Sequence, residues 1–201
     1  MGSRVMHYCI STLLAKELGV GNRATFILGG IAPDAHGYPG GNRDITHFKD
    51  VDERGRRFIN YRRFCLQYRH KITEPFYLGY LCHLISDEVR LECFRKAQTD
   101  SHPGHQVQDR IYRDFVRLNG RIIMKYGLQM QRHEVPAMDV EGMSTEGLSI
   151  LLDQVRQDFI FDESALREPL EIFRNDGNDV DDYISQSVTR CTHFIRDERL
   201  M

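Results

Sequence analysis

The stretch FYLGYLCHLISDEVRLECF, residues 76–94, decides how the rest of the chain is interpreted. Its apolar side chains point in nearly every helical direction, as a stripe of Phe76, Tyr80 and Phe94 with Tyr77, Leu81, Leu84, Ile85 and Val89 around it. A helix that is apolar on all sides is buried. We therefore predict a helix from Glu74 to Ala97, entered through Pro75, at the centre of the fold.

Two polar residues interrupt this apolar helix. His83 and Asp87 are four residues apart, so their side chains project from the same face, one turn from each other. Burying an unpaired carboxylate is costly, and a cationic partner or a metal ion offsets the cost. An isolated pair of this kind is also explained by an arginine or a protonated His83 beside Asp87.

Further amphipathic segments surround the central helix and are separated by Gly, Pro and Asn/Asp residues. No segment has the pattern of a β-strand ladder. We predict an all-α, compact multi-helix domain covering residues 1–201, with the part after Tyr126 supplying packing helices. The predicted additional helices are Val5–Leu18, Glu53–His70, Gln106–Tyr126, Thr145–Phe159, Ser164–Arg174 and Val180–Arg196.

The composition favours a small-molecule partner. The 201 residues carry a formal net charge of -2, which disfavours a long nucleic-acid footprint. A locally basic stretch, Arg54–Arg57 followed by Arg62 and Arg63, is interpreted as a solvated helix face. The alternative is that these guanidinium groups attract an anionic substrate such as a phosphoester.

The cysteines and the N-terminal residues predict a cytoplasmic protein. Five Cys, an odd number without a C-x-x-C pair, argue against a disulfide framework and a thiolate zinc site. The first apolar stretch is interrupted by Lys16 and Glu17, so no signal peptide is evident. No segment has the length and apolar character of a transmembrane helix.

A broken segment from Pro33 to about Asp52 is predicted to be a long functional loop. It contains four groups that can bind a metal, Asp34, His36, Asp44 and His47. His7 lies on the inward stripe of the first helix, with Ile10 and Leu14.

We expect His7, Asp34 and His47 to join His83 and Asp87 in a metal centre. Imidazole nitrogen and carboxylate oxygen suit Zn²⁺, with Mn²⁺ or Fe²⁺ as alternatives. Taken singly, His7 is also explained as a core histidine, Asp34 as a turn residue after Pro33, and His47 as a surface side chain.

The order of these groups resembles the zinc-dependent phospholipase C family, which is related to the S1/P1-type nucleases. The matching stretches are RVMHYCI at His7, G-x-I-A-P-D ending at Asp34, T-H-F at His47, and G-Y-L-x-H-L-x-x-D with His83 and Asp87. The resemblance covers roughly the first 90 residues. It implies an all-α fold with two or three zinc ions that hydrolyses phosphate esters, and metal roles for these five residues.

The chain departs from the family pattern after Asp87. The family has a further His and an H-x3-E pair there, whereas this chain has Leu91 and Cys93 nearby. Asp114, flanked by apolar residues in a predicted helix, is our favoured substitute ligand, with an internal salt bridge as its alternative. Other candidates are Cys93 and the His105-x3-Asp109 pair.

The predicted activity is hydrolysis of a small-molecule phosphate ester or phosphodiester by a metal-activated water. Asp34 is the predicted catalytic residue, orienting the proton of that water, and Arg90 is placed to neutralise phosphate charge. An HD-type phosphohydrolase is a weaker alternative, because none of the nine His is followed by Asp. A non-catalytic helical binding module with a structural metal site is the remaining alternative.

Overall fold

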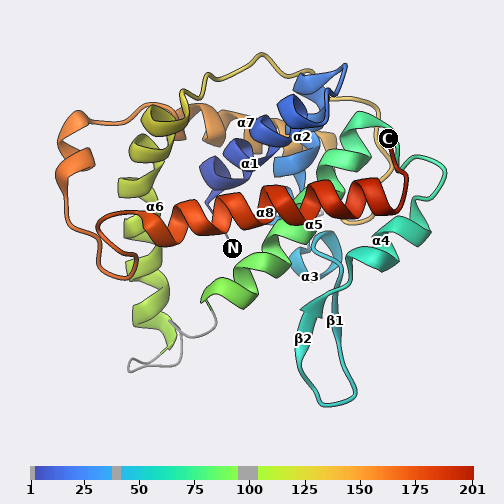
Figure 1. The fold of residues 1–201 in the computed structure, drawn as a ribbon, viewed down its shortest axis with the longest axis horizontal. Coiled ribbons are helices and arrows are strands. Elements are labelled where there is room, and N and C mark those ends of the chain that lie inside the picture. The colour runs from blue at the N-terminus through green and yellow to red at the C-terminus, as the bar shows by residue number, and fades with distance from the viewer. Residues whose placement is uncertain (1–2, 38–41, 95–103) are drawn as a thin grey trace.

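Helix α5 (Pro75–Phe94) runs through the centre of the protein, with helices on several sides of it (Figure 1). The computed structural model describes residues 3–37, 42–94 and 104–201, and within them the side chains of residues 36, 37, 94 and 104–108 are not described. The all-α prediction is confirmed. The other helices of the described residues are α1 (Arg4–Glu17), α2 (Arg23–Ile31), α3 (Arg43–Thr46), α4 (Tyr61–Gln67), α6 (Gly104–Tyr126), α7 (Thr145–Asp158) and α8 (Asn178–Asp197), with 3-10 helices η1 (Ala32–Gly37) and η2 (Glu163–Arg167).

Helices α2 and α5 approach each other at glycine contacts. A Cβ atom at Gly29 would lie 2.0 Å from the Phe76 carbonyl oxygen, and one at Gly79 would lie 2.0 Å from that of Phe26. Only glycine fits at such distances. The close contact fixes the end of α2, and therefore η1 with Asp34, beside the middle of α5.

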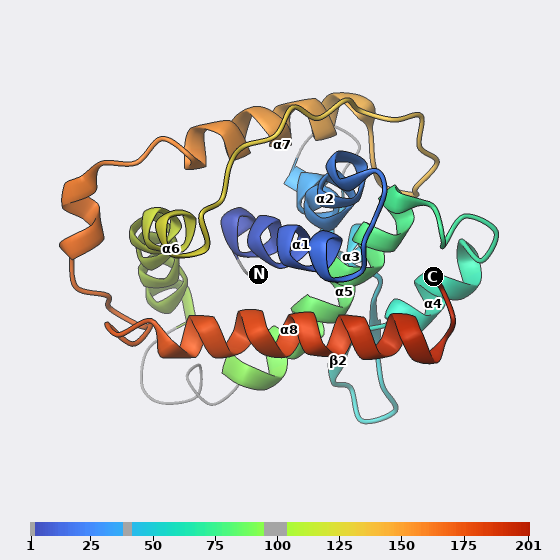
Figure 2. The same cartoon turned by 45° about the horizontal axis from the view of Figure 1, so that its top comes forward.

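Helices α1 and α8 pack against α5 and against each other. Helix α7 lies on the opposite side of α1 and α2 from α8, and it contacts η1 (Figure 2). The core is continuous and includes buried side chains from all of these helices. Within the described ranges, no helix has the length and apolar character needed to cross a membrane.

The predicted helix Glu53–His70 is wrong in its first part. Strand β1 (Lys49–Val51) pairs antiparallel with β2 (Arg57–Ile59), and only α4 lies in the remainder. The Asp52 carboxylate accepts the backbone N–H groups of Arg54 and Arg56, so it competes with helical hydrogen bonding. The hairpin projects from the helical body (Figure 1).

The basic residues of this segment are exposed: those from Arg54 to Arg57 belong to the hairpin, and Arg62 and Arg63 lie on α4. Arg56 pairs with Asp52, Arg62 with Glu198, and Arg63 with Asp50. This distribution agrees with the interpretation of a solvated basic surface.

Two other segments differ from the predicted elements. The predicted loop from Pro33 to Asp52 contains η1, α3 and β1, while its residues 38–41 lie outside the described part. The predicted helix Ser164–Arg174 is reduced to η2, because Pro169 cannot continue a helix. The predicted end of the central helix at Ala97 also falls outside the described residues.

Candidate metal centre

Five predicted ligands come together in the core of the protein. His7 lies on α1, Asp34 in η1, His47 directly after α3, and His83 and Asp87 on α5. His7, His83 and Asp87 each offer a ligand atom within 4.8 Å of the other two, and so do Asp34, His47 and His83. All five side chains are buried, at 0–6% exposure.

The tautomer of His83 is set by a backbone carbonyl. Its Nδ1–H donates a 2.9 Å hydrogen bond to the Gly30 carbonyl oxygen, which can only accept. In the neutral imidazole the other nitrogen then carries a lone pair. That nitrogen, Nε2, lies 3.4 Å from Nε2 of His47.

The other two histidines are anchored by hydroxyl groups. Ser86 donates its hydroxyl proton to the His83 carbonyl oxygen at 2.8 Å, so its oxygen is left to accept from Nδ1 of His7 at 3.2 Å. Thr46 likewise donates to the Arg43 carbonyl oxygen at 3.4 Å and lies 3.1 Å from Nδ1 of His47. The Nδ1 atoms of all three rings are thus engaged, and their Nε2 atoms are the ones that face the neighbouring rings and carboxylates of the cluster.

The distances between donors match those around a single metal ion. Nε2 of His47 lies 3.6 Å from Asp34 Oδ1 and 3.6 Å from Asp87 Oδ2, and Nε2 of His7 lies 3.4 Å from Asp87 Oδ1. Ligand atoms that surround one ion tetrahedrally, at bond lengths of about 2.1 Å, are about 3.4 Å apart. These four pairs, counting that of His47 with His83, therefore have the spacing of ligands to one Zn²⁺ ion, within two triads that share His83.

The electrostatics of the cluster keep both carboxyl groups ionised and His83 neutral. Burial lowers the pKa of His83 to about 3, helped by repulsion from His7, so this ring is neutral at physiological pH. Burial acts to raise the pKa of both carboxyl groups, but contact with His47 holds that of Asp34 below its ordinary value, and His7 does the same for Asp87. Two buried carboxylates thus face a neutral imidazole.

Among the described residues, several atoms of the cluster have no hydrogen-bond partner. These buried atoms are Nε2 of His7, both carboxylate oxygens of Asp34, and Oδ1 of Asp87. Buried polar atoms without partners are rare, and an ion is one of the ordinary explanations.

Comparisons of the chain with protein-family models, with curated proteins and with solved structures find no match.

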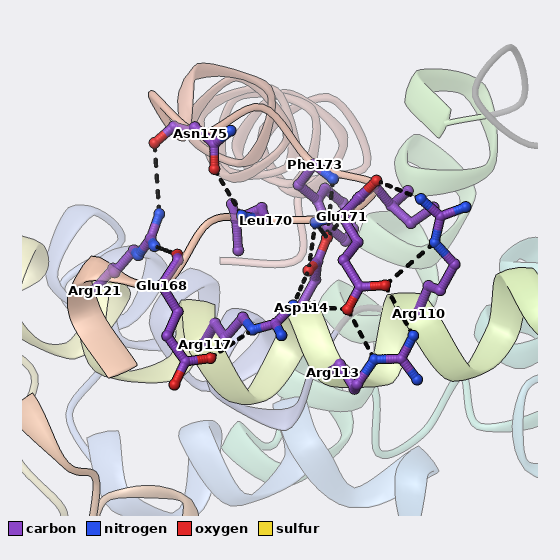
Figure 3. Close-up of polar contacts among 11 residues, drawn as sticks. Arg110, Arg113, Asp114, Arg117, Arg121, Glu168, Leu170, Glu171, Phe173 and Asn175 are labelled. Atoms are coloured by element: carbon purple, nitrogen blue, oxygen red, sulfur yellow. Dashed lines mark hydrogen bonds and ion pairs between the residues drawn. The ribbon is translucent and has the colours of Figure 1, made fainter. Parts of the chain in front are cut away.

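Asp114 does not join the cluster, which corrects its prediction as a metal ligand. It lies on α6, and its carboxylate accepts backbone N–H groups of Glu171, Ile172 and Phe173 at 2.7–3.1 Å (Figure 3). Arg117 adds an ion pair at 3.2 Å. The buried carboxylate thus holds the segment after η2 against α6. This role is close to the internal salt bridge that was the alternative to a metal ligand for Asp114.

The other candidates take different places. Asp44 is an exposed partner of Lys49 at 2.8 Å, and Cys93 donates to Gln186 at 3.7 Å. The side chains of His36 and His105 lie outside the described part of the structure, and Asp109 is exposed. The five cysteines are free thiols.

The sequence indicated the ligands but not the groups that orient them. The Gly30 carbonyl, Thr46 and Ser86 fix the three ring tautomers, and none belongs to a residue type that marks a metal site. A partial signal exists for Ser86, which precedes Asp87 and lies three residues after His83. The Gly30 contact depends on the packing of two helices and has no signal in sequence.

Proposed function

We propose that the protein is a zinc-dependent hydrolase that acts on a phosphate ester or phosphodiester. The observation that carries the proposal is the burial, within a few ångströms of one another, of three imidazole rings and two carboxylates whose facing atoms lie 3.4–3.6 Å apart. A divalent cation is a ligand that such a donor set can bind. The nitrogen and oxygen donors and their spacing favour Zn²⁺, with Mn²⁺ or Fe²⁺ as alternative ions.

A divalent ion held here supplies a polarised phosphoryl oxygen and a bound water whose pKa is lowered towards neutrality. His7, Asp34, His47, His83 and Asp87 would hold the ion in this proposal. Asp34 has both carboxylate oxygens without a hydrogen-bond partner. It therefore has an oxygen to spare for the proton of the attacking water, which is the catalytic role we assign to it.

The resemblance of the first 90 residues to zinc-dependent phospholipase C supports the same reaction class. That resemblance places metal roles on His7, Asp34, His47, His83 and Asp87, and these are the five residues that come together in the structure. A second or third ion, as in the family, would need ligands beyond these five.

A structural metal site in a non-catalytic helical module is the second candidate. The burial of all five donors favours it, because structural zinc is closed by protein ligands whereas catalytic zinc keeps a position for water. The hydrolase therefore needs an open coordination position on the ion for water, and the structural site does not.

The deciding experiment is metal analysis of tag-free protein purified without chelator, beside the His83→Ala/Asp87→Ala double variant. We expect at least one equivalent of zinc in the wild type and none in the variant. Turnover of phosphodiester substrates that is lost in Asp34→Asn, with zinc retained, supports the hydrolase. Zinc without turnover of any phosphoester supports the structural site, and a folded wild type that binds no metal overturns both candidates.

A further inference from the structure

Arg90 lies one turn after Asp87 on α5, at the edge of the donor cluster. Its Nε atom is 3.5 Å from Asp87 Oδ1, the oxygen that also faces His7. The Arg90 side chain is 13% exposed, in contrast to 3% for Asp87. The guanidinium therefore lies between the buried cluster and the protein surface.

The hydrogen bonds of Arg90 are not satisfied by Asp87. Within the described part of the chain, its buried Nε atom has no hydrogen-bond partner, and its ion pair is with Asp87. A guanidinium has five N–H donors in a planar fork that matches carboxylate and phosphate groups. The contact of 3.5 Å with Asp87 leaves the Nε–H of this fork without a hydrogen bond.

Metal binding leaves the charge of Arg90 unbalanced. Asp34 and Asp87 each carry one negative charge, and the three imidazoles are neutral when they bind a metal. A Zn²⁺ ion cancels both carboxylates, including the one beside Arg90. The loaded centre then has an excess positive charge at the guanidinium, which is a binding site for an anion.

The distances suit a group that binds the ion and Arg90 together. An ion about 2.1 Å from Asp87 Oδ1 lies at most about 5–6 Å from Nε of Arg90. Two oxygens of one phosphoryl group span such a gap, one bound to the ion and the other accepting an N–H of the guanidinium.

We propose that Arg90 is an anion-binding residue of the centre, which holds a non-bridging phosphoryl oxygen of the substrate beside the metal. The inference rests on the proposed function and assigns the substrate contact within it. Arg90 acts on the substrate and is not a metal ligand. Its removal should therefore weaken anion binding and leave the metal in place.

The test measures the binding of inorganic phosphate by isothermal titration calorimetry. The protein is first loaded with zinc and freed of excess metal. Compared with the wild type, Arg90→Gln should bind phosphate about tenfold more weakly or worse, since a charged hydrogen bond is lost. Arg90→Lys, which keeps the charge without the fork, should lie between them. The control is Arg190→Gln, which removes an exposed arginine paired with Glu92 of the same helix α5.

The outcomes separate this inference from the proposed function. A wild type that binds no zinc overturns the proposed function and the inference with it. If the wild type and Arg90→Gln both bind zinc and have equal affinity for phosphate, the inference alone is overturned. The same holds if the wild type binds zinc but no phosphate. If Arg90→Gln loses its zinc, Arg90 supports the ligand Asp87, and the substrate role is overturned.

Discussion

Each histidine of the cluster is held by the partner of its Nδ1 atom. For His7 this partner is Ser86, whose hydroxyl proton is committed to the His83 carbonyl. Groups that orient metal ligands in this way commonly contribute 10–100-fold to metal affinity.

We expect Ser86→Ala to lower zinc affinity by about tenfold, because the His7 ring loses the acceptor that fixes its tautomer. Competition with a chromophoric chelator measures this affinity. Ser149→Ala is the control, since Ser149 is exposed on α7 and bonds only its own helix. Equal affinities for the two variants would contradict the assigned role of Ser86.

Asp114 shows why residue type and burial alone misassign a carboxylate. A buried Asp amid apolar neighbours in the sequence is compatible with a metal ligand and with a structural acceptor. The difference lies in the N–H groups of residues 171–173, which are nearly 60 positions away along the chain.

Asp114→Asn should destabilise the fold by about 2–3 kcal/mol and leave zinc stoichiometry unchanged. The amide nitrogen of Asn cannot accept the backbone N–H groups that now share the two oxygens, and charged hydrogen bonds are lost. Urea unfolding measures the stability and metal analysis the stoichiometry. Loss of zinc in a folded Asp114→Asn protein would restore Asp114 as a ligand.

At the scale of elements, an arginine ladder joins α6 to the segment after η2. Glu171 pairs with Arg110, Arg113 and Arg117 (Figure 3). Hydrogen bonds from Arg113 and Arg117 lower the pKa of Glu171 from 4.5 to about 2. A carboxylate whose pKa is lower in the folded state stabilises the fold above its unfolded pKa, and this contribution disappears as the pH falls.

We therefore expect the stability difference between the wild type and Glu171→Gln to be greatest above about pH 4.5. The difference should shrink as the pH falls from 4.5 towards 2, where Glu171 becomes protonated in the folded state as well. Urea unfolding across this pH range measures it. A difference that stays constant with pH would contradict the ion-pair origin.

The contact between α2 and α5 gives a prediction about packing. Gly79→Ala places a methyl group against the Phe26 carbonyl, so the helices must separate, at a cost of about 1–3 kcal/mol. Because α2 leads into Asp34, zinc affinity should fall as well. Gly21→Ala, where a Cβ atom meets nothing within 4 Å, should change stability by less than about 0.5 kcal/mol.

Helical periodicity predicted the long elements well and the short ones poorly. Helices α5, α6, α7 and α8 carry apolar residues at helical spacing over many turns, and their predicted ranges agree with the structure. The hairpin was missed because each strand has three residues, too few to show alternation. Its turn did have a local signal, Asp52 three residues before Gly55, which adopts a φ of 75°.

For the whole molecule, ion binding should appear as stability. A ligand that binds only the folded state adds about 2.7 kcal/mol at a free concentration one hundred times its dissociation constant. For a protein of this size that corresponds to a rise of about 5–10 °C in Tm.

Differential scanning fluorimetry with zinc, and after dialysis against chelator, measures this shift. The His83→Ala/Asp87→Ala variant should show no rise in Tm with zinc. A wild-type Tm that is the same with and without zinc would contradict a metal centre in the core.

The candidate ligands of the site could be predicted because their side chains are of metal-binding types and follow one another in a recognisable order. How closely these side chains come together could not be predicted, because it depends on tertiary distances. His7 and His83 stack with ring centroids 3.9 Å apart, although 76 positions separate them in the chain. Helical spacing places Arg90 beside Asp87. The structure is needed to show that the Nε atom of Arg90 is buried without a hydrogen-bond partner among the described residues.

All five donors lie within the first 87 residues, whereas α8, which packs on α5 and α1, begins at Asn178. This order has a consequence in time. During synthesis the five donors leave the ribosome before α8 does. At about 5–20 residues per second, the delay is roughly 5–20 s. An ion bound in that interval would neutralise Asp34 and Asp87 while they are still hydrated, so two bare carboxylates need never leave water unaccompanied.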